Sequence, residues 1–445
     1  MDRRAHERYV ELAMRNIGKT GPLWWLVAGI LAVLVAAGLF AYGYQIQRGH
    51  SVTGVSYTIF WGFYIVNFVF FIGISYGGAI TSAILRLTNA KWRAPITRLA
   101  EGTALVTLLV GSASVIVDVA RPDRILNLFL YAQVGSPITW DWIAINTYLV
   151  GTIIFFYLPL IPDLGVCRDT YGPAVRGLRG WAYRTLSLGW RGTPEQERAL
   201  LGGIGIMAVL IIPLAIAVHS VLAWLFAVTA QGGWHSTIFA PLFVLAAMLS
   251  GVATVILVIA GFRKVYGLEE FITAKHFRYL SYLLLALGAG YIYFMVSEYL
   301  TEGYVQAAET APVLQALFVG NYAPGFWAFV LGGLVLPLAL VARSGPHLVA
   351  RTCVASILVA GGMWFKRYLI ILIPGMSGPL MPWELYKPTW VELAITIGAA
   401  AAIPLGLMVL FFFFPVMSVH EMEEVEGAPE PLRPGLTPAF AGGDE

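Results

Sequence analysis

The stretch FWGFYIVNFVFFIGISYGGAITSAILRL, residues 60–87, decides the fold class. Its first charged side chain is Arg86, so the uncharged run before it exceeds the roughly 20 helical residues that cross the hydrocarbon core of a bilayer. A helix with apolar side chains in every direction cannot turn one side to water. The stretch therefore predicts a membrane-spanning helix.

Runs of this kind recur along the whole chain. Of its 445 residues, 58% are hydrophobic and 12% are charged, about half the charged fraction of a typical soluble domain. We therefore predict an all-α integral membrane protein with about ten transmembrane helices. The expected spans are 22–43, 57–85, 99–118, 138–162, 200–229, 236–262, 279–300, 312–342, 348–370 and 390–418.

The placement of lysine and arginine predicts the orientation. If successive loops alternate between the two sides, 22 of the 28 basic residues fall on the side of the N-terminal tail. Such loops stay in the cytoplasm. We expect a cytoplasmic N-terminal tail at 1–21 with no removable signal peptide, a membrane domain at 22–418, and an acidic cytoplasmic tail at 419–445 that is mobile or lies on a partner.

The longest loop, about 164–199, divides the helices into two halves. Helices 2–5 and 6–9 are expected to form two four-helix bundles, flanked by helices 1 and 10. GGAITSAILRL at 77–87 is faintly similar to SGVATVILVIA at 250–260, which suggests an internal repeat.

Cysteine and histidine usage limits the cofactors of this chain. Cys167 and Cys353 are far apart, so we expect no iron–sulfur cluster and no metal site. His219 is the only histidine expected well inside a span, whereas membrane haem needs a pair of axial ligands, so no bound haem is expected. Motifs for ATP hydrolysis, acyl transfer and zinc hydrolysis are absent.

Ionisable side chains inside the apolar runs are the candidate functional residues, because a charge in the membrane costs several kcal/mol unless it is paired or hydrated. With the orientation above, most of them fall near the outer ends of their helices. The set comprises Asp118, Arg121, Asp141, His219, Glu298, Lys366 and Arg367.

Structural alternatives exist for these residues. Most of them could be interfacial side chains that reach water or form structural ion pairs. His219 lies deeper, where the alternative is a histidine hydrogen-bonded to a neighbouring helix. Trp140, beside Asp141, could belong to an interfacial aromatic belt or could hold a flat quinone headgroup.

Several strings resemble one known family. Beside residues 60–87, they are KWRAPITRLAE, DVARPDR, SPITWDWIAINTYL, YLPLIPDLGVCRD, GWHSTIFAP, MWFKRYLIIL and YKPTWVE. Together they resemble the NrfD/PsrC family of quinone-interacting membrane subunits over about residues 55–420. The resemblance is strongest to the long, ten-helix branch that includes ActC and ActF of bacterial alternative complex III.

This resemblance implies a function in electron transfer. It implies a quinone substrate, expected to be menaquinone, and an extracytoplasmic iron–sulfur or molybdopterin-containing partner. Other membrane subunits, including an NrfD-like sister, are expected in the same bacterial cytoplasmic membrane, and nucleic acid is not. Asp141 matches a carboxylate at the quinone site of ActC-like members, and Asp118 stands where those members commonly have His. Tyr76 and Leu225 depart from the His and Asp typical of ActC.

The roles expected for the candidates follow from quinol chemistry, in which two protons leave with two electrons. Asp118, Asp141 and His219 are predicted to accept or relay these protons. Arg121, Trp140, Asp141 and Glu298 are the predicted quinone contacts. A proton path from the inside is predicted through Glu101, Asp163, His219, Lys366 and Arg367.

Two other functions remain open from the sequence. One is a structural or proton-conducting anchor subunit without its own quinone site. The other is a secondary transporter, which would place its site near the midplane on broken helices.

Overall fold

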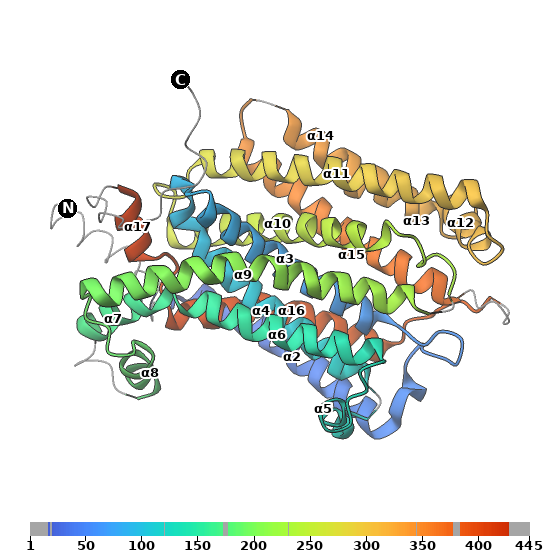
Figure 1. Cartoon of the computed structure of the whole chain (residues 1–445), viewed down its shortest axis with the longest axis horizontal. Coiled ribbons are helices and arrows are strands. Elements are labelled where there is room, and N and C mark those ends of the chain that lie inside the picture. Colours follow the sequence, from blue (N-terminus) through green and yellow to red (C-terminus); the bar gives the residue numbers. More distant parts are fainter. Residues whose placement is uncertain are drawn as a thin grey trace.

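Long apolar helices lie side by side along one direction in the computed structural model of the chain, which describes residues 17, 20–119, 121–171, 177–229, 231–343, 345–376 and 383–426 (Figure 1). These residues form helices and loops without a strand. Ten of the helical segments are long and apolar enough to cross a membrane. The predicted all-α membrane fold is confirmed.

The helices have the following bounds. They are α2 Pro22–Arg48, α3 Phe63–Leu87, α4 Ala94–Asp118, α5 Asn127–Leu130, α6 Pro137–Tyr157, α7 Leu160–Tyr171, α8 Leu178–Leu186, α9 Pro194–Ala227, α10 Phe239–Tyr266, α11 Ala274–Val305, α12 Ala311–Phe318, α13 Ala323–Ala328, α14 Leu336–Ala342, α15 Leu348–Met376, α16 Trp390–Phe413 and α17 Val419–Glu426. A π-helical segment, Phe329–Val335, joins α13 to α14.

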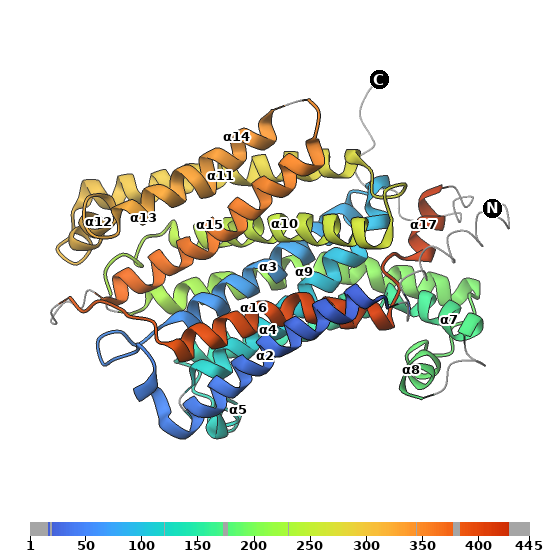
Figure 2. The same cartoon turned by 180° about the vertical axis from the view of Figure 1, so that it is seen from behind.

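The spanning helices form two bundles of four, with two flanking helices (Figure 2). The first bundle contains α3, α4, α6 and α9, and the second contains α10, α11, α13 with α14, and α15. The flanking helices α2 and α16 pack on each other, and α16 also packs against α4. Nearly every residue of α3 is buried, because this helix contacts both bundles. Its apolar sequence on all sides suits that central position.

The two ends of the molecule are named here by the short helices that mark them. The α17 end carries α17, α7 and α8, and the α5 end carries α5 and α12 (Figure 1). Trp24 and Phe412 are in ring contact at 5.6 Å, so the chain enters the first span and leaves the last one at the α17 end.

The bundles approach each other most closely at two glycines. A Cβ atom added to Gly77 of α3 would lie 2.4 Å from the Cα atom of Gly251 on α10. Both glycines belong to the two similar strings noted in the sequence. The absence of side chains brings the two backbones together, as small residues do where membrane helices cross.

Gly77→Ala is expected to destabilise the protein by about 1–3 kcal/mol, because the added methyl group forces α3 and α10 apart. The measurement is the thermal unfolding midpoint of the purified protein in detergent. Gly261→Ala on α10 is the matched control, since a Cβ atom there meets open space. Equal midpoints for the two variants would contradict the close crossing.

Several predicted span boundaries were wrong by five or more residues, including the starts at 57 and 200, where the structure begins α3 at Phe63 and α9 at Pro194. The span 138–162 ends at Tyr157, and a separate α7 begins at Leu160, because Pro159 interrupts the helical pattern. The span 312–342 divides into α12 and α13 with a turn between them. The span 348–370 continues to Met376, so Lys366 and Arg367 lie deeper in their helix than predicted.

The first part of the predicted mobile tail is also structured. Residues 419–426 form α17, which contacts α4 and α7, and Val419 and Met422 are buried. Residues 427–445 lie outside the described part of the chain.

Candidate functional site

A crevice of about 280 Å³ opens between the flanking helices and the first bundle, in the half of the protein toward the α5 end. Most of its wall is apolar, with Val35 and Leu39 from α2 and Leu109 from α4. Four side chains give it polar groups. They are Tyr42, Tyr64, Asn67 and Ser114.

These polar groups are held in place by hydrogen bonds. The Tyr64 hydroxyl donates to Gln45 Oε1 at 2.5 Å, and the Gln45 amide donates to the Val117 carbonyl at 3.1 Å. Asn67 donates to Thr396 Oγ1 at 2.8 Å and accepts from the Trp364 indole at 2.9 Å. The bonds fix the rotamers of Tyr64 and Asn67 without using all of their bonding capacity.

Asp118 lies at the end of α4, directly after the crevice residue Val117. Its half-buried carboxylate is close enough to Tyr64 and Glu392 to interact with them electrostatically. The imidazole of His50 lies near the main chain of Asp118. Asp118, a predicted proton acceptor, therefore lies at one end of the crevice.

Glu392 anchors the loops that close this region. Its carboxylate accepts hydrogen bonds from the Tyr386 hydroxyl at 2.5 Å, the Gly54 amide at 2.8 Å and the Thr389 amide at 2.9 Å. The bond from Thr389 forms part of a capping box at the start of α16. Glu392 is a satisfied buried carboxylate, and it supplies a negative charge near Asp118.

The four predicted quinone contacts lie elsewhere. Arg121 is exposed, and its guanidinium pairs with Asp123 at 2.9 Å. Trp140 is half-exposed, and its indole donates to the Val134 carbonyl at 2.7 Å. Asp141 is buried on α6, and its Oδ1 atom has no hydrogen-bond partner among the described residues. Glu298 belongs to the second bundle.

A small cavity of about 20 Å³ brings three predicted residues of the proton path together. It is lined by His219, Lys366 and Arg367, and also by Tyr291, and it has room for about one water molecule. The His219 ring lies 4.6 Å from the ring of Tyr76, and its Nδ1 atom is 3.3 Å from the Ala215 carbonyl oxygen. Its Nε2 atom is without a partner among the described residues.

The cavity adjoins a second one of similar volume, about 20 Å³, lined by Glu298 and Tyr299. Glu298 accepts a hydrogen bond from Ser236 at 2.6 Å, and Lys366 donates to the Tyr299 hydroxyl. Leu242 and Ile370 line both cavities. Glu298, Lys366 and His219 therefore form a buried polar row that joins the second bundle to the first.

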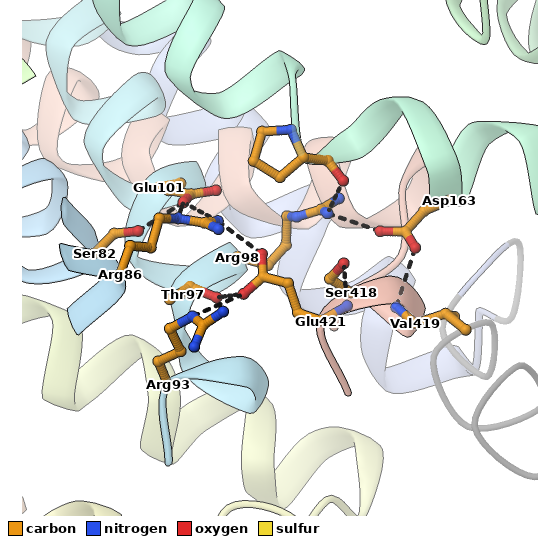
Figure 3. A network of polar contacts seen from close by, with 11 residues as sticks. Ser82, Arg86, Arg93, Thr97, Arg98, Glu101, Asp163, Ser418, Val419 and Glu421 are labelled. Carbon is orange, nitrogen blue, oxygen red and sulfur yellow. Dashed lines mark hydrogen bonds and ion pairs between the residues drawn. The ribbon is translucent and has the colours of Figure 1, made fainter. Parts of the chain in front are cut away.

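Glu101 and Asp163, the other predicted residues of the proton path, lie at the α17 end in a network of buried ion pairs (Figure 3). Glu101 pairs with Arg86 at 2.7 Å and accepts a hydrogen bond from Ser82 at 2.6 Å. Asp163 pairs with Arg98 at 2.7 Å, and both side chains are fully buried. The structure thus divides the predicted path into two parts, the polar row and this network.

Residues that sequence reasoning missed complete both regions. Tyr64 and Asn67 lie in α3 ahead of the SYGG segment, in a run that carries no charge and therefore gives no signal of a site. Arg86 and Arg98 enter the sequence prediction only as loop charges. The available signal was Arg98, three residues before Glu101 in the sequence.

Comparison with known proteins identifies relatives over most of the chain. A model of the family described as "Polysulphide reductase, NrfD" matches residues 51–377. The chain is 29% identical to a putative dimethyl sulfoxide reductase membrane subunit of Halobacterium salinarum, over 91% of this chain and 93% of that protein.

Two further relatives are named as subunits of redox enzymes. Identity is 24% to a selenate reductase subunit of Mesobacillus selenatarsenatis, over 90% of this chain and 97% of that protein. It is also 24% to an Hdr-like menaquinol oxidoreductase integral membrane subunit of Archaeoglobus fulgidus, over 89% of this chain and 95% of that protein.

Proposed function

Because this chain belongs to the polysulphide reductase NrfD family, we propose that it is the quinone-reacting membrane subunit of an oxidoreductase complex. The relatives named as reductase or menaquinol oxidoreductase subunits support this assignment. The substrate is a quinol, with menaquinol as the favoured species. A partner subunit at the α5 end takes the electrons on an iron–sulfur or similar centre, as in an alternative complex III-like assembly.

The observation that carries the proposal is the crevice beside Asp118. Its volume of about 280 Å³ is close to the lower limit of about 300 Å³ for small-molecule pockets. Its apolar wall between α2 and α4 suits an isoprenoid-substituted ring that arrives from the lipid. Its polar groups lie in the same half of the membrane as the end at which the partner would bind.

The chemistry of the crevice residues fits a quinol headgroup. Each quinol hydroxyl needs an acceptor, and the Ser114 and Tyr64 oxygens have lone pairs free to accept. Asp118 would take a proton as the electrons leave to the partner. Asp141 lies on α6 outside the crevice, buried with one oxygen that has no partner among the described residues, and it is the alternative candidate acceptor. Glu298 and the polar row would serve the later movement of protons.

We assign the α17 end to the cytoplasm, because the loops rich in Lys and Arg lie there. Proton entry from that side would begin at Glu101 and Asp163 and reach the His219, Lys366 and Arg367 row through internal water.

Ala113→Phe is expected to weaken binding of a quinol analogue at least about tenfold, because the added ring fills the crevice that Ala113 lines. The measurement is fluorescence quenching of heptyl-hydroxyquinoline N-oxide by the purified protein. Val296→Phe on α11 is the control, since Val296 is an exposed apolar residue outside the crevice. Unchanged affinity in Ala113→Phe would place the quinone elsewhere.

A further inference from the structure

After α16, the chain lies against the α17 end of the first bundle. Val416, Met417, Ser418, Val419 and Met422 are all at most 7% exposed. The helix that they lead into contacts α4 and α7, which carry Glu101 and Asp163 (Figure 3). The C-terminal segment therefore covers the α17 end of that bundle.

Two carboxylates hold this segment in place. Glu421 of α17 accepts from Arg86 Nη2 at 2.7 Å and from Thr97 Oγ1 at 3.0 Å, and it lies 3.9 Å from Arg93 Nε. On the other side, Asp163 Oδ1 accepts from the Val419 amide at 3.0 Å. The contacts join α17 to side chains on α3, α4 and α7 and to the turn before α4.

Three arginines, Arg86, Arg93 and Arg98, surround the carboxylate of Glu421. Arg86 also pairs with Glu101, and Arg98 pairs with Asp163, so Glu421 brings a third carboxylate to a cluster of buried ion pairs. Burial alone raises the pKa of Glu421, but Arg86, Arg93 and Arg98 outweigh it, so its pKa lies below the ordinary value. Glu421 is therefore ionised at neutral pH, and the bond to Arg86 is charge-assisted.

Polar groups lie directly beneath this segment. Arg86 uses the same Nη2 atom to bond Glu421 and Glu101, both at 2.7 Å. Glu101 is 1% exposed, and its Oε2 atom has no partner among the described residues. An unpartnered carboxylate oxygen would gain a hydrogen bond if water reached it.

We infer that α17 is a movable cover, called the closure below, over the α17 end of the first bundle. Glu421 stabilises the closed position, and release of α17 from that position admits water to Glu101. The segment is short and lies outside the ten spanning helices, so its contacts can break while those helices stay packed. The inference that α17 closes this end follows from its contacts alone. The role of the closure in proton entry rests on the proposed function.

The test uses a thiol placed under the closure. Ser82 is fully buried and donates to Glu101, so Ser82→Cys changes one atom beside Glu101. The full-length protein with this reporter is treated with a polar maleimide, and the labelled cysteines are quantified by peptide mass spectrometry. Adding Glu421→Gln is expected to speed labelling of the reporter about 10- to 100-fold, the ratio that corresponds to loss of a charge-assisted hydrogen bond.

Two controls separate opening from unfolding. Glu195→Gln removes an exposed carboxylate at the same end of the protein and should leave the labelling rate unchanged. Cys353, on α15 in the second bundle, should keep its wild-type rate in every variant. If Glu421→Gln does not yield folded protein, Thr97→Val removes one hydrogen bond to Glu421 and should give a smaller rise.

If the reporter is labelled at the wild-type rate in both Glu421→Gln and Thr97→Val, the inference that Glu421 keeps α17 closed is wrong. None of these measurements needs quinol or a partner protein. Failure of the proposed quinone site would therefore leave them unaffected. If labelling rises but proton uptake by vesicles containing the complex does not change, the closure stands and the proposed proton entry at Glu101 fails.

Discussion

Asp118→Asn is expected to lower quinol oxidation by the assembled complex by about 100- to 10,000-fold, the usual contribution of a general base. The amide keeps the shape of the side chain but cannot accept a proton from the quinol. The measurement is the oxidation rate of a soluble naphthoquinol by membranes that contain the complex. Complex assembly is checked by co-purification of the partner subunits.

The matched control is Asp123→Asn, an exposed carboxylate five residues further along that pairs with Arg121. It should oxidise quinol at the wild-type rate. Asp141→Asn, assayed in parallel, separates the two candidate acceptors. Loss of activity in Asp141→Asn alone would move the site from the crevice to α6, and full activity in both variants would favour an anchor subunit whose sister reacts with the quinone.

Asp163→Asn is expected to destabilise the protein by about 3–5 kcal/mol, because it leaves the Arg98 charge buried without its partner. Arg98 and Asp163 have fully buried side chains, and their 2.7 Å bond joins α4 to α7. The measurement is the thermal unfolding midpoint in detergent, together with the amount of protein recovered from membranes.

The double variant Arg98→Met/Asp163→Leu should recover most of the loss, since apolar side chains of similar size need no charge partner. Arg121→Ala breaks an ion pair whose side chains are 60% and 58% exposed, and it should leave the midpoint unchanged. A midpoint for Asp163→Asn equal to that of Arg121→Ala would show that the buried pair contributes nothing to stability.

The sequence was sufficient for the features that depend on length and composition. The ten spans follow from apolar runs, and the structure confirms them together with the two predicted bundles. The division of the two halves at the long loop 164–199 was wrong, because this loop joins α6 to α9 within the first bundle. Predicted helix boundaries were wrong where the sequence did not show whether a proline ends a helix or lies inside one. Pro159 ends a helix, whereas Pro374 lies inside α15, because neighbouring helices can satisfy the backbone group that a proline leaves free.

The candidate site was less predictable, because charge is the strongest signal of a site in an apolar sequence. Tyr64 and Asn67 are uncharged, and their position on the crevice depends on how α2 and α16 pack against α3 and α4. Likewise, the partner of Arg86 in α17 is 335 residues away in sequence. Contacts at such separations follow from packing, which local patterns do not encode.

That separation has a consequence for biosynthesis. At about 5–20 residues per second, the ribosome needs roughly 20 to 70 s to advance from Arg86 to Glu421. During this interval Arg86 has Glu101 as a partner but not yet Glu421. A chain that stops before Glu421 therefore leaves the α17 end of the first bundle without the cover that α17 supplies.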